Sequence, residues 1–468
     1  MKGLLLIYAI VTIGSIVALR LPTIGLLVCV GFSVLRPEAL WGWAGNLNYM
    51  TRIVAIPMLI GWAFRGFGSW RLGRARSIVI SLVLYTVWLM ISSSQGIDTE
   101  AAWWSVLEFS KTLLPVLVGV TMMTSEKETR RLLWVMVLAQ AYVSFDMNML
   151  YLGGYNKAQA EGFGGMDNNC FGISLLSTLG AALALVLSSK RVILKAVAAG
   201  ATLLILHTIL LTFSRGAFVG LLCVGFTALV VLPKKLKYVG TIVLAGVITY
   251  QLIGPELSNR LQSTFAPQKN RDDSAEGRID LWRDCFTLIS EEPFFGVGPT
   301  GWPKVASQFG WPEGKEAHSL WIQTTAEIGV PGVLFLMMFY LLTIKRLWPI
   351  ARERSPGRDP TVPLIATGII LSLVGFATSA QFVSLTGLEA PFWVTMVGAT
   401  LLKIRSLPEL ATEPASEAPK KIDAPLATAT ASLPAKPSLN SPVPTAGRAT
   451  RGPVLPAASR AAHRGTSS

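Results

Sequence analysis

The stretch HSLWIQTTAEIGVPGVLFLMMFYLLTIKRL, His318 to Leu347, begins at a histidine, continues as a largely apolar run and ends close to Lys345 and Arg346. An apolar run of about 17 to 25 residues is long enough to cross a bilayer as a helix. Lysine and arginine are enriched in cytoplasmic loops. The stretch is therefore predicted to be a membrane span whose histidine end lies outside and whose basic end lies in the cytoplasm.

The same pattern recurs along most of the chain. Of its 468 residues, 51% are hydrophobic and only 15% are charged, whereas soluble proteins carry roughly 25% charged residues. Spans are expected to begin near residues 3, 21, 52, 77, 103, 131, 170, 192, 215, 238, 319, 362 and 387. We therefore predict an all-α integral membrane protein in which residues 1–407 form a polytopic bundle of about 12–13 transmembrane helices.

The N-terminal stretch MKGLLLIYAIVTIGSIVAL has the lysine and the apolar run of a secretory signal peptide. It lacks a small-x-small cleavage site before the next span begins, so it is interpreted as a retained first span. Whether the first two spans are separate crossings stays open.

Loop charges assign the two sides of the membrane. Basic connections alternate with poorly basic ones, and the basic ones lie at residues 65–76, 125–131, 189–191, 233–237 and 345–358. Because basic loops stay in the cytoplasm, the alternation places the C-terminus there. The same loops account for the net charge of +14, so nucleic acid is not an expected partner.

One external connection, residues 254–317, is much longer than the others and contains no spanning run. Loops longer than about 12–15 residues usually have a function. Within this one, GRIDLWRDCFTLI (Gly277 to Ile289) has the spacing of an amphipathic helix, which Pro293 and the following glycines end. We expect this helix to lie against the outer face of the membrane. Residues 408–468 are rich in Ala, Pro, Ser and Thr, which predicts a disordered cytoplasmic tail.

Three basic side chains on the external side are candidates for chemistry. Arg215 lies between two apolar runs, Arg278 begins the amphipathic helix and His318 begins a span. An ionisable group at membrane depth is a functional hypothesis by default, and imidazole is a common general base. The alternatives are a snorkelling arginine, a solvated loop charge and a polar group in a first helical turn.

A metal centre is not predicted. No second His, Cys or carboxylate lies at ligand spacing from His318. Asp272 and Asp273 could hold a divalent ion, although adjacent carboxylates alone are weak evidence. Cys170 and Cys285 fall near external loops, which leaves a disulfide open.

Three motifs in fixed order resemble the O-antigen ligase and polymerase superfamily. HSLWIQTTAEIGVPG resembles its histidine motif, His-Ser followed nine residues later by Gly-x-x-Gly. RIDLWRDCFTLISEEPFFGVGPTGW is similar to the Arg-x-x-x-Trp and Pro-x-x-Gly-x-Gly segment of its periplasmic loop, and TFSRGAFVG to its Ser-Arg-Gly turn. The motifs cover about residues 200–345. GMDNNCFGI (Gly165 to Ile173) resembles, more narrowly, the O-glycosylation ligases associated with exosortase systems.

The resemblance implies a GT-C-like, metal-independent inverting glycosyltransferase without a cofactor in the bacterial inner membrane. Its partners would be an undecaprenyl-diphosphate-linked glycan donor, an acceptor hydroxyl on lipid A core, protein or polysaccharide, and membrane lipids. Arg215 and Arg278 would hold the diphosphate, since guanidinium groups bind such anions bidentately. His318 would deprotonate the acceptor on the periplasmic side. The expected substrate-binding residues are Ser214, Trp282, Arg283 and Ser319.

Two alternatives remain. A polymerase, which joins one lipid-linked glycan to another, is poorly separated from a ligase by sequence. A transporter or flippase of lipid-linked glycans would also need many spans and intramembrane arginines. Transporters tend to contain paired internal repeats with broken helices, and none is found in the sequence.

Overall fold

The computed structural model describes residues 2–44, 47, 49–232, 273–353, 359–384 and 387–412. Over these residues the regular structure is helical, and the one pairing of strand type is an isolated bridge between Phe163 and Met166. Met1–Pro414 forms one compact unit. The all-α fold predicted from the apolar runs is thereby confirmed.

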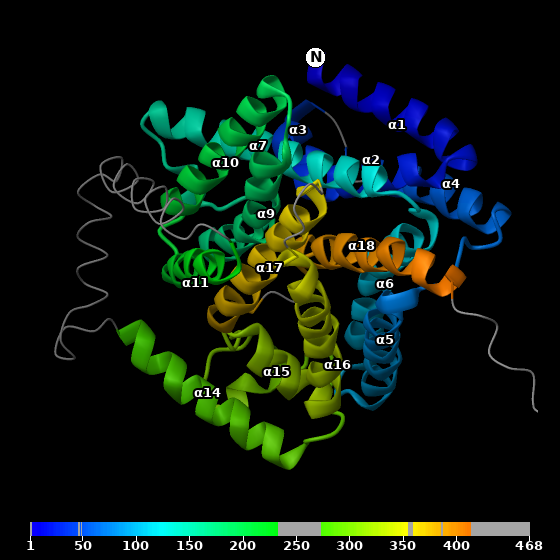
Figure 1. The fold of residues 1–468 in the computed structure, drawn as a ribbon. Coiled ribbons are helices and arrows are strands. Elements are labelled where there is room, and N and C mark those ends of the chain that lie inside the picture. The colour runs from blue at the N-terminus through cyan, green and yellow to red at the C-terminus, as the bar shows by residue number, and fades with distance from the viewer. Residues whose placement is uncertain are drawn as a thin grey trace, which may run out of the picture. The chain divides into compact units, whose positions relative to one another are not determined.

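The helices follow the predicted spans closely (Figure 1). In chain order they are α1 (Lys2–Arg20), α2 (Pro22–Leu35), α3 (Pro37–Trp41), α4 (Met50–Phe64), α5 (Arg76–Gln95), α6 (Thr99–Met122), α7 (Glu126–Leu152), α8 (Lys157–Ala160), α9 (Asn168–Ser188), α10 (Val192–Leu211), α11 (Arg215–Val231), α14 (Asp273–Glu291), α15 (Trp302–Val305), α16 (Leu320–Ala351), α17 (Thr361–Ser379) and α18 (Ala390–Thr412). Short 3-10 helices cover Gly42–Ala44, Gly73–Ala75, Ala306–Phe309 and Ala380–Phe382.

Eight helices of the described chain are long and apolar enough to cross a membrane: α1, α5, α6, α7, α9, α10, α16 and α17. The apolar helices α2, α4 and α11 are shorter, at 14, 15 and 17 residues. The span predicted near residue 238 and the first part of the long loop lie outside the described residues. So do residues 413–468 of the predicted tail, whereas α18 continues through Thr412.

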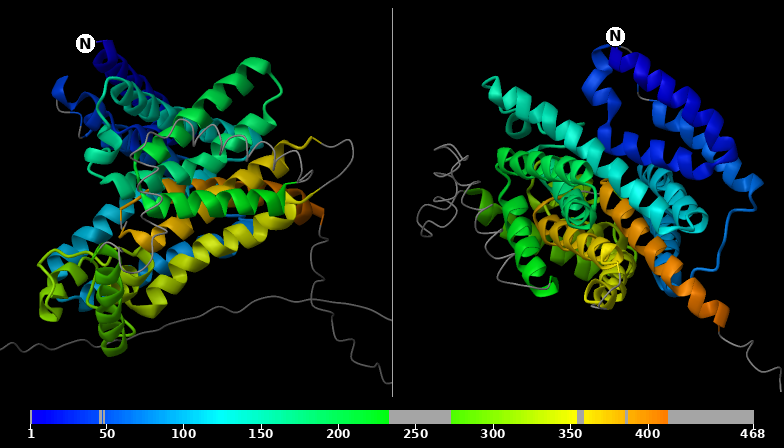
Figure 2. Two further views of the ribbon diagram at one scale, coloured as in Figure 1. Left: turned by 90° about the vertical axis from the view of Figure 1, so that its left-hand side faces the viewer. Right: turned by 45° about the horizontal axis from the view of Figure 1, so that its top comes forward.

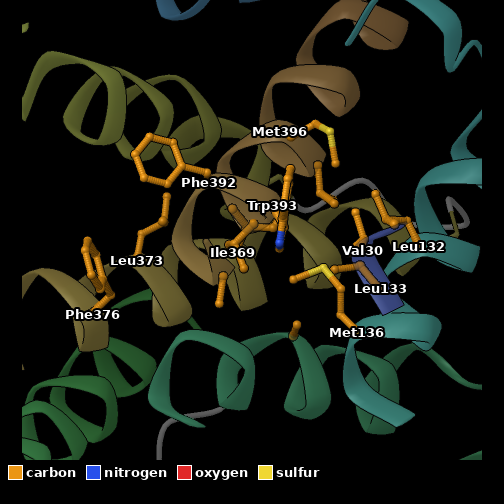
Figure 3. Packing of buried hydrophobic residues seen from close by; sticks show 14 of the residues in the cluster. Val30, Leu132, Leu133, Met136, Ile369, Leu373, Phe376, Phe392, Trp393 and Met396 are labelled. Carbon is orange, nitrogen blue, oxygen red and sulfur yellow. The ribbon is translucent and has the colours of Figure 1, made fainter. Parts of the chain in front are cut away.

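The main core lies where α2, α7, α9, α17 and α18 pack together. Figure 3 shows side chains of these helices directed toward one another, with Trp393 of α18 between Ile369 of α17 and Met136 of α7. Backbones approach closely at small residues: a Cβ added to Gly180 of α9 would lie 2.3 Å from the carbonyl oxygen of Gly368 in α17. Small residues at such crossings are typical of membrane helix pairs.

Helix α16 is broken near its N-terminal end. Gly329 has φ 73° and ψ 174°, a region that essentially only glycine occupies, and Pro331 cannot donate a backbone hydrogen bond. The carbonyl groups of Ala326 and Glu327 would otherwise lack partners. They accept instead from Val297 N at 3.1 Å and Gly298 N at 2.8 Å, so the glycine-rich part of the long loop completes the broken helix.

The predicted amphipathic helix is confirmed as α14, and much of its apolar face is covered by protein. Leu281, Cys285 and Leu288 belong to a second core with Trp302 of α15 and Ile322 of α16. Figures 1 and 2 show α14 and α15 beside the same end of α16. This part of the face is therefore not the membrane-contacting surface that we expected from the sequence. Two other apolar residues of α14, Ile279 and Phe286, are 55% and 57% exposed.

Candidate active site

Arg215 is positioned by a tight turn between α10 and α11. Phe213 adopts φ 51° there, and the Ser214 hydroxyl accepts a hydrogen bond from Ala217 N at 3.3 Å, so Arg215 is the first residue of α11. Ser379 of α17 donates to Gly216 O at 3.0 Å. These contacts hold the turn from both sides and leave the Arg215 side chain exposed.

The same turn is supported by the loop that precedes α9. Asn168 Nδ2 donates to Thr212 O at 3.0 Å, and the neighbouring Asp167 is the N-cap of α9, accepting from Cys170 N at 2.7 Å. The GMDNN stretch therefore places a carboxylate beside the arginine turn. Asp167 was not among the candidate residues predicted from the sequence. An Asp directly before an apolar run is a helix N-cap signal, and this signal could have identified it.

His318 lies directly before α16 in a strained conformation. Its φ is 51°, which is uncommon for a residue with a side chain. Ser319 is the N-cap of α16 and accepts from Ile322 N at 3.4 Å. Both backbone polar groups of the preceding Ala317 are hydrogen-bonded. Its N–H donates to Gln323 Oε1 at 3.0 Å, and its carbonyl accepts from Trp282 Nε1 at 2.8 Å. Helix α14 thereby fixes the backbone from which His318 projects.

Arg278 interacts electrostatically with both Arg215 and His318. The pKa of Arg278, which is half-buried in α14, is lowered by burial and next by the charge of Arg215, while Asp167 opposes this. The pKa of His318 is lowered by burial, then by Arg278 and Lys315, again opposed by Asp167. These groups are therefore close enough to act on one another. Because the pKa of His318 lies below its usual 6.5, the imidazole is mostly neutral at pH 7.

A second carboxyl group lies at the margin of this cluster. Burial, and then the charge of Asp167, raises the pKa of Glu316. Lys315, Glu316 and Asp167 were not among the residues chosen from the sequence, because only the fold brings α9 and the start of α16 together.

The four residues expected to bind substrate have other contacts in the structure. Ser214 and Ser319 are fully buried and cap helices. Trp282 holds the carbonyl of Ala317. Arg283 points away from the core with its side chain 72% exposed and pairs with Asp280 at 2.8 Å. Three of the four thus support the backbone beside Arg215 and His318.

The structure also bears on the metal site and the disulfide that the sequence left open. No cluster of three His, Cys, Asp or Glu residues suited to a metal ion occurs in the described parts of the chain, and Asp272 lies outside them. Cys170 and Cys285 are free thiols. Within α6, Glu108 pairs with Lys111, which lies three residues further along the same helix.

The eight apolar helices of the described chain are those of a multi-pass membrane protein, in which Arg278 lies near both Arg215 and His318. Residues 200–337, from α10 to the middle of α16, match the O-antigen ligase family. The match covers less than half of the chain; it supports the O-antigen ligase superfamily and a membrane glycan ligase or polymerase type of function. No curated protein matches the chain.

Proposed function

We propose that this protein transfers a glycan from an undecaprenyl-diphosphate carrier to an acceptor hydroxyl, by a single inverting displacement without a metal ion or another cofactor. The observation that carries the proposal is that Arg278 interacts electrostatically with both Arg215 and His318, although the three come from separate segments of the chain. Arginine pairs bind phosphate groups, and a neutral imidazole accepts protons, so the cluster contains both functions that the reaction needs.

In the proposed step, the acceptor oxygen attacks the anomeric carbon of the donor sugar. The acceptor proton passes to His318, the new carbon–oxygen bond forms, and the bond from the anomeric carbon to the diphosphate breaks. The leaving oxygen takes the bonding electron pair and remains on the lipid diphosphate. No covalent glycosyl-enzyme intermediate forms, because one displacement from the opposite face inverts the anomeric configuration.

The leaving group is stabilised by positive charge that is already in place. Arg278 is half-buried next to a like charge, which lowers its pKa, and a bound diphosphate would relieve that repulsion. Arg215 is the first residue of α11, and the N-terminus of a helix favours an anion. Fixed charges of this kind lower a barrier most because they do not have to reorganise during the reaction.

The capping serines and Trp282 act in this proposal as positioning residues. Ser214 caps α11, which begins with Arg215, and Ser319 caps α16, which follows His318. Trp282 fixes the peptide group before His318. Arg283 would contact the outer part of the substrate, because its side chain is 72% exposed. The alternation of loop charge supports a periplasmic site in the inner membrane.

A polymerase would use the same chemistry with a second lipid-linked glycan as the acceptor. Membership of the exosortase-associated branch rests on GMDNNCFGI, whose Asp167 and Asn168 border the site. A flippase would need no proton acceptor, so the neutral state of His318 favours glycan transfer over transport.

The test is glycan transfer by the purified full-length protein in lipid nanodiscs, with an undecaprenyl-diphosphate-linked glycan and EDTA present. We expect transfer by the native protein, loss of transfer by His318→Ala and retained transfer by His207→Gln, a control histidine that bonds to Asn148 within the bundle. Normal transfer by His318→Ala would refute the general-base role. A requirement for added divalent metal would refute stabilisation by arginine alone.

A further inference from the structure

A cavity of about 300 Å³ lies between α5, α6 and α16, roofed by the glycine-rich part of the long loop. Its polar lining includes Tyr85, Glu108, Thr300, Glu327, Tyr340 and Glu389. It is separate from the arginine cluster, since neither Arg215 nor Arg278 lines it. Nothing in the proposed displacement accounts for this cavity.

The lining is unsuited to two parts of the donor, its diphosphate and its polyprenyl chain. Three carboxylates face the cavity, and no Lys or Arg is among the described residues that line it. Lys111 and Arg36 act on Glu108 and Glu389 from outside the lining. A diphosphate would find carboxyl groups and no cationic partner in this lining, and a polyprenyl chain would desolvate those groups without giving a hydrogen bond.

An unpartnered hydroxyl group independently indicates a polar ligand. Tyr340 lines the cavity and is 2% exposed. None of the hydrogen bonds of the described residues involves its hydroxyl, which lines the cavity and is not one of the fully buried unpartnered atoms; polar groups in such places are nearly always hydrogen-bonded. Glu327, at 4% exposure, accepts from Gln323 Nε2 at 3.0 Å and from the backbone N–H groups of Thr300 and Trp302. A ligand that brings its own hydroxyl groups would supply the partner that the Tyr340 hydroxyl lacks.

Aromatic rings complete the wall of the cavity. Phe109, Phe376 and Phe392 line it beside Tyr85 and Tyr340. A saccharide presents apolar C–H faces, which pack on such rings, and hydroxyl groups, which donate to carboxylates. Few precisely placed polar groups in an aromatic cavity are typical of small-molecule sites.

The cavity lies beside the proposed proton acceptor and leads outward. Leu320 and Thr324, in the first two turns of α16 after His318, are part of its wall. Ser105 and Thr300 also line an open groove with Trp103 and Trp104 of α6. A chain whose end occupies the cavity can therefore leave the protein along this groove.

We propose that this cavity is the acceptor site and that it takes the end of an uncharged, hydroxyl-rich saccharide in preference to a phosphorylated one. The assignment of the occupant as acceptor rests on the proposed function. It narrows the acceptor classes, because a phosphate-bearing core saccharide would find no cationic side chain in the described lining.

The test measures saccharide binding without a donor, by saturation-transfer NMR on the full-length protein in nanodiscs. The probes are methyl glycosides of glucose, galactose, mannose and N-acetylglucosamine, and the 6-phosphates of the same glycosides. The variants are Tyr340→Phe and Glu327→Gln. Tyr142→Phe is the matched control, because Tyr142 is 46% exposed on α7 and packs against Trp41 outside the cavity.

We expect at least one uncharged glycoside to bind, its 6-phosphate to bind more weakly, and Tyr340→Phe to weaken binding about fivefold through the loss of one hydrogen bond. Equal or tighter binding of the 6-phosphates, no binding of any uncharged glycoside, or unchanged binding in both cavity variants would each overturn the proposal.

A parallel measurement in His318→Ala separates this inference from the proposed function. Saccharide binding that persists while transfer is lost supports both. Saccharide binding in a native protein that transfers no glycan would keep the cavity as a saccharide site and remove its assignment as the acceptor site.

Discussion

Replacement of Gly329 by alanine should detach the glycine-rich part of the long loop from α16. An added Cβ would lie 1.8 Å from Phe294 O and 3.0 Å from Phe295 N, distances at which the backbone must move. The residue also has φ 73° and ψ 174°, so the substitution costs about 1–3 kcal/mol in backbone strain before any overlap is counted.

The size of the effect follows from the hydrogen bonds between the loop and α16 that the added Cβ would break. Val297 N to Ala326 O, Gly298 N to Glu327 O and Val330 N to Pro293 O, at 3.1, 2.8 and 2.9 Å, join the loop to the broken helix. At about 1 kcal/mol net for each bond, their loss and the strain together weaken the docking of the loop by roughly 4–6 kcal/mol. We therefore expect local opening of the loop while the bundle stays folded.

Hydrogen exchange with mass spectrometry would measure this opening, and the nanodisc assay would measure transfer. Gly329→Ala should speed exchange across residues 293–301 and abolish transfer. Gly200→Ala is the matched control, because a Cβ there meets no atom within 4 Å. Native exchange and native transfer in Gly329→Ala would refute the docking argument.

Three further variants test the site. Lys315→Gln removes a charge that lowers the pKa of His318, so the acid limb of the pH–rate profile should move to higher pH; an unmoved limb would contradict the assignment of the base. Arg278→Gln should reduce kcat/KM by about 10²-fold or more, with partial recovery in Arg278→Lys, and equal rates for both variants would contradict bidentate binding. Trp282→Phe removes the bond to Ala317 and should slow transfer about tenfold at unchanged expression; Trp311→Phe, which loses the 2.8 Å bond to Asp284 on the same loop, should not.

The bundle could be predicted from the sequence because each span carries its own signal. A helix in a bilayer satisfies its backbone hydrogen bonds internally, so an apolar run alone specifies it. The signal for the helix of residues 273–291 is equally local, because the spacing of its apolar residues can be read from that segment alone. The three candidate residues Arg215, Arg278 and His318 could likewise be selected, because charges beside apolar runs and the order of three motifs are properties of the chain.

The tertiary structure decided how those residues are held and what surrounds them. Asp167 acts on Arg278 and His318 only because α9 packs beside the arginine turn. The apolar face of α14 meets a second core instead of the membrane. The first of these pairings joins segments more than a hundred residues apart, and no local periodicity encodes either one. The break in α16 illustrates both levels: Gly329 and Pro331 mark it in the sequence, but the loop that supplies the missing donors is known only from the fold.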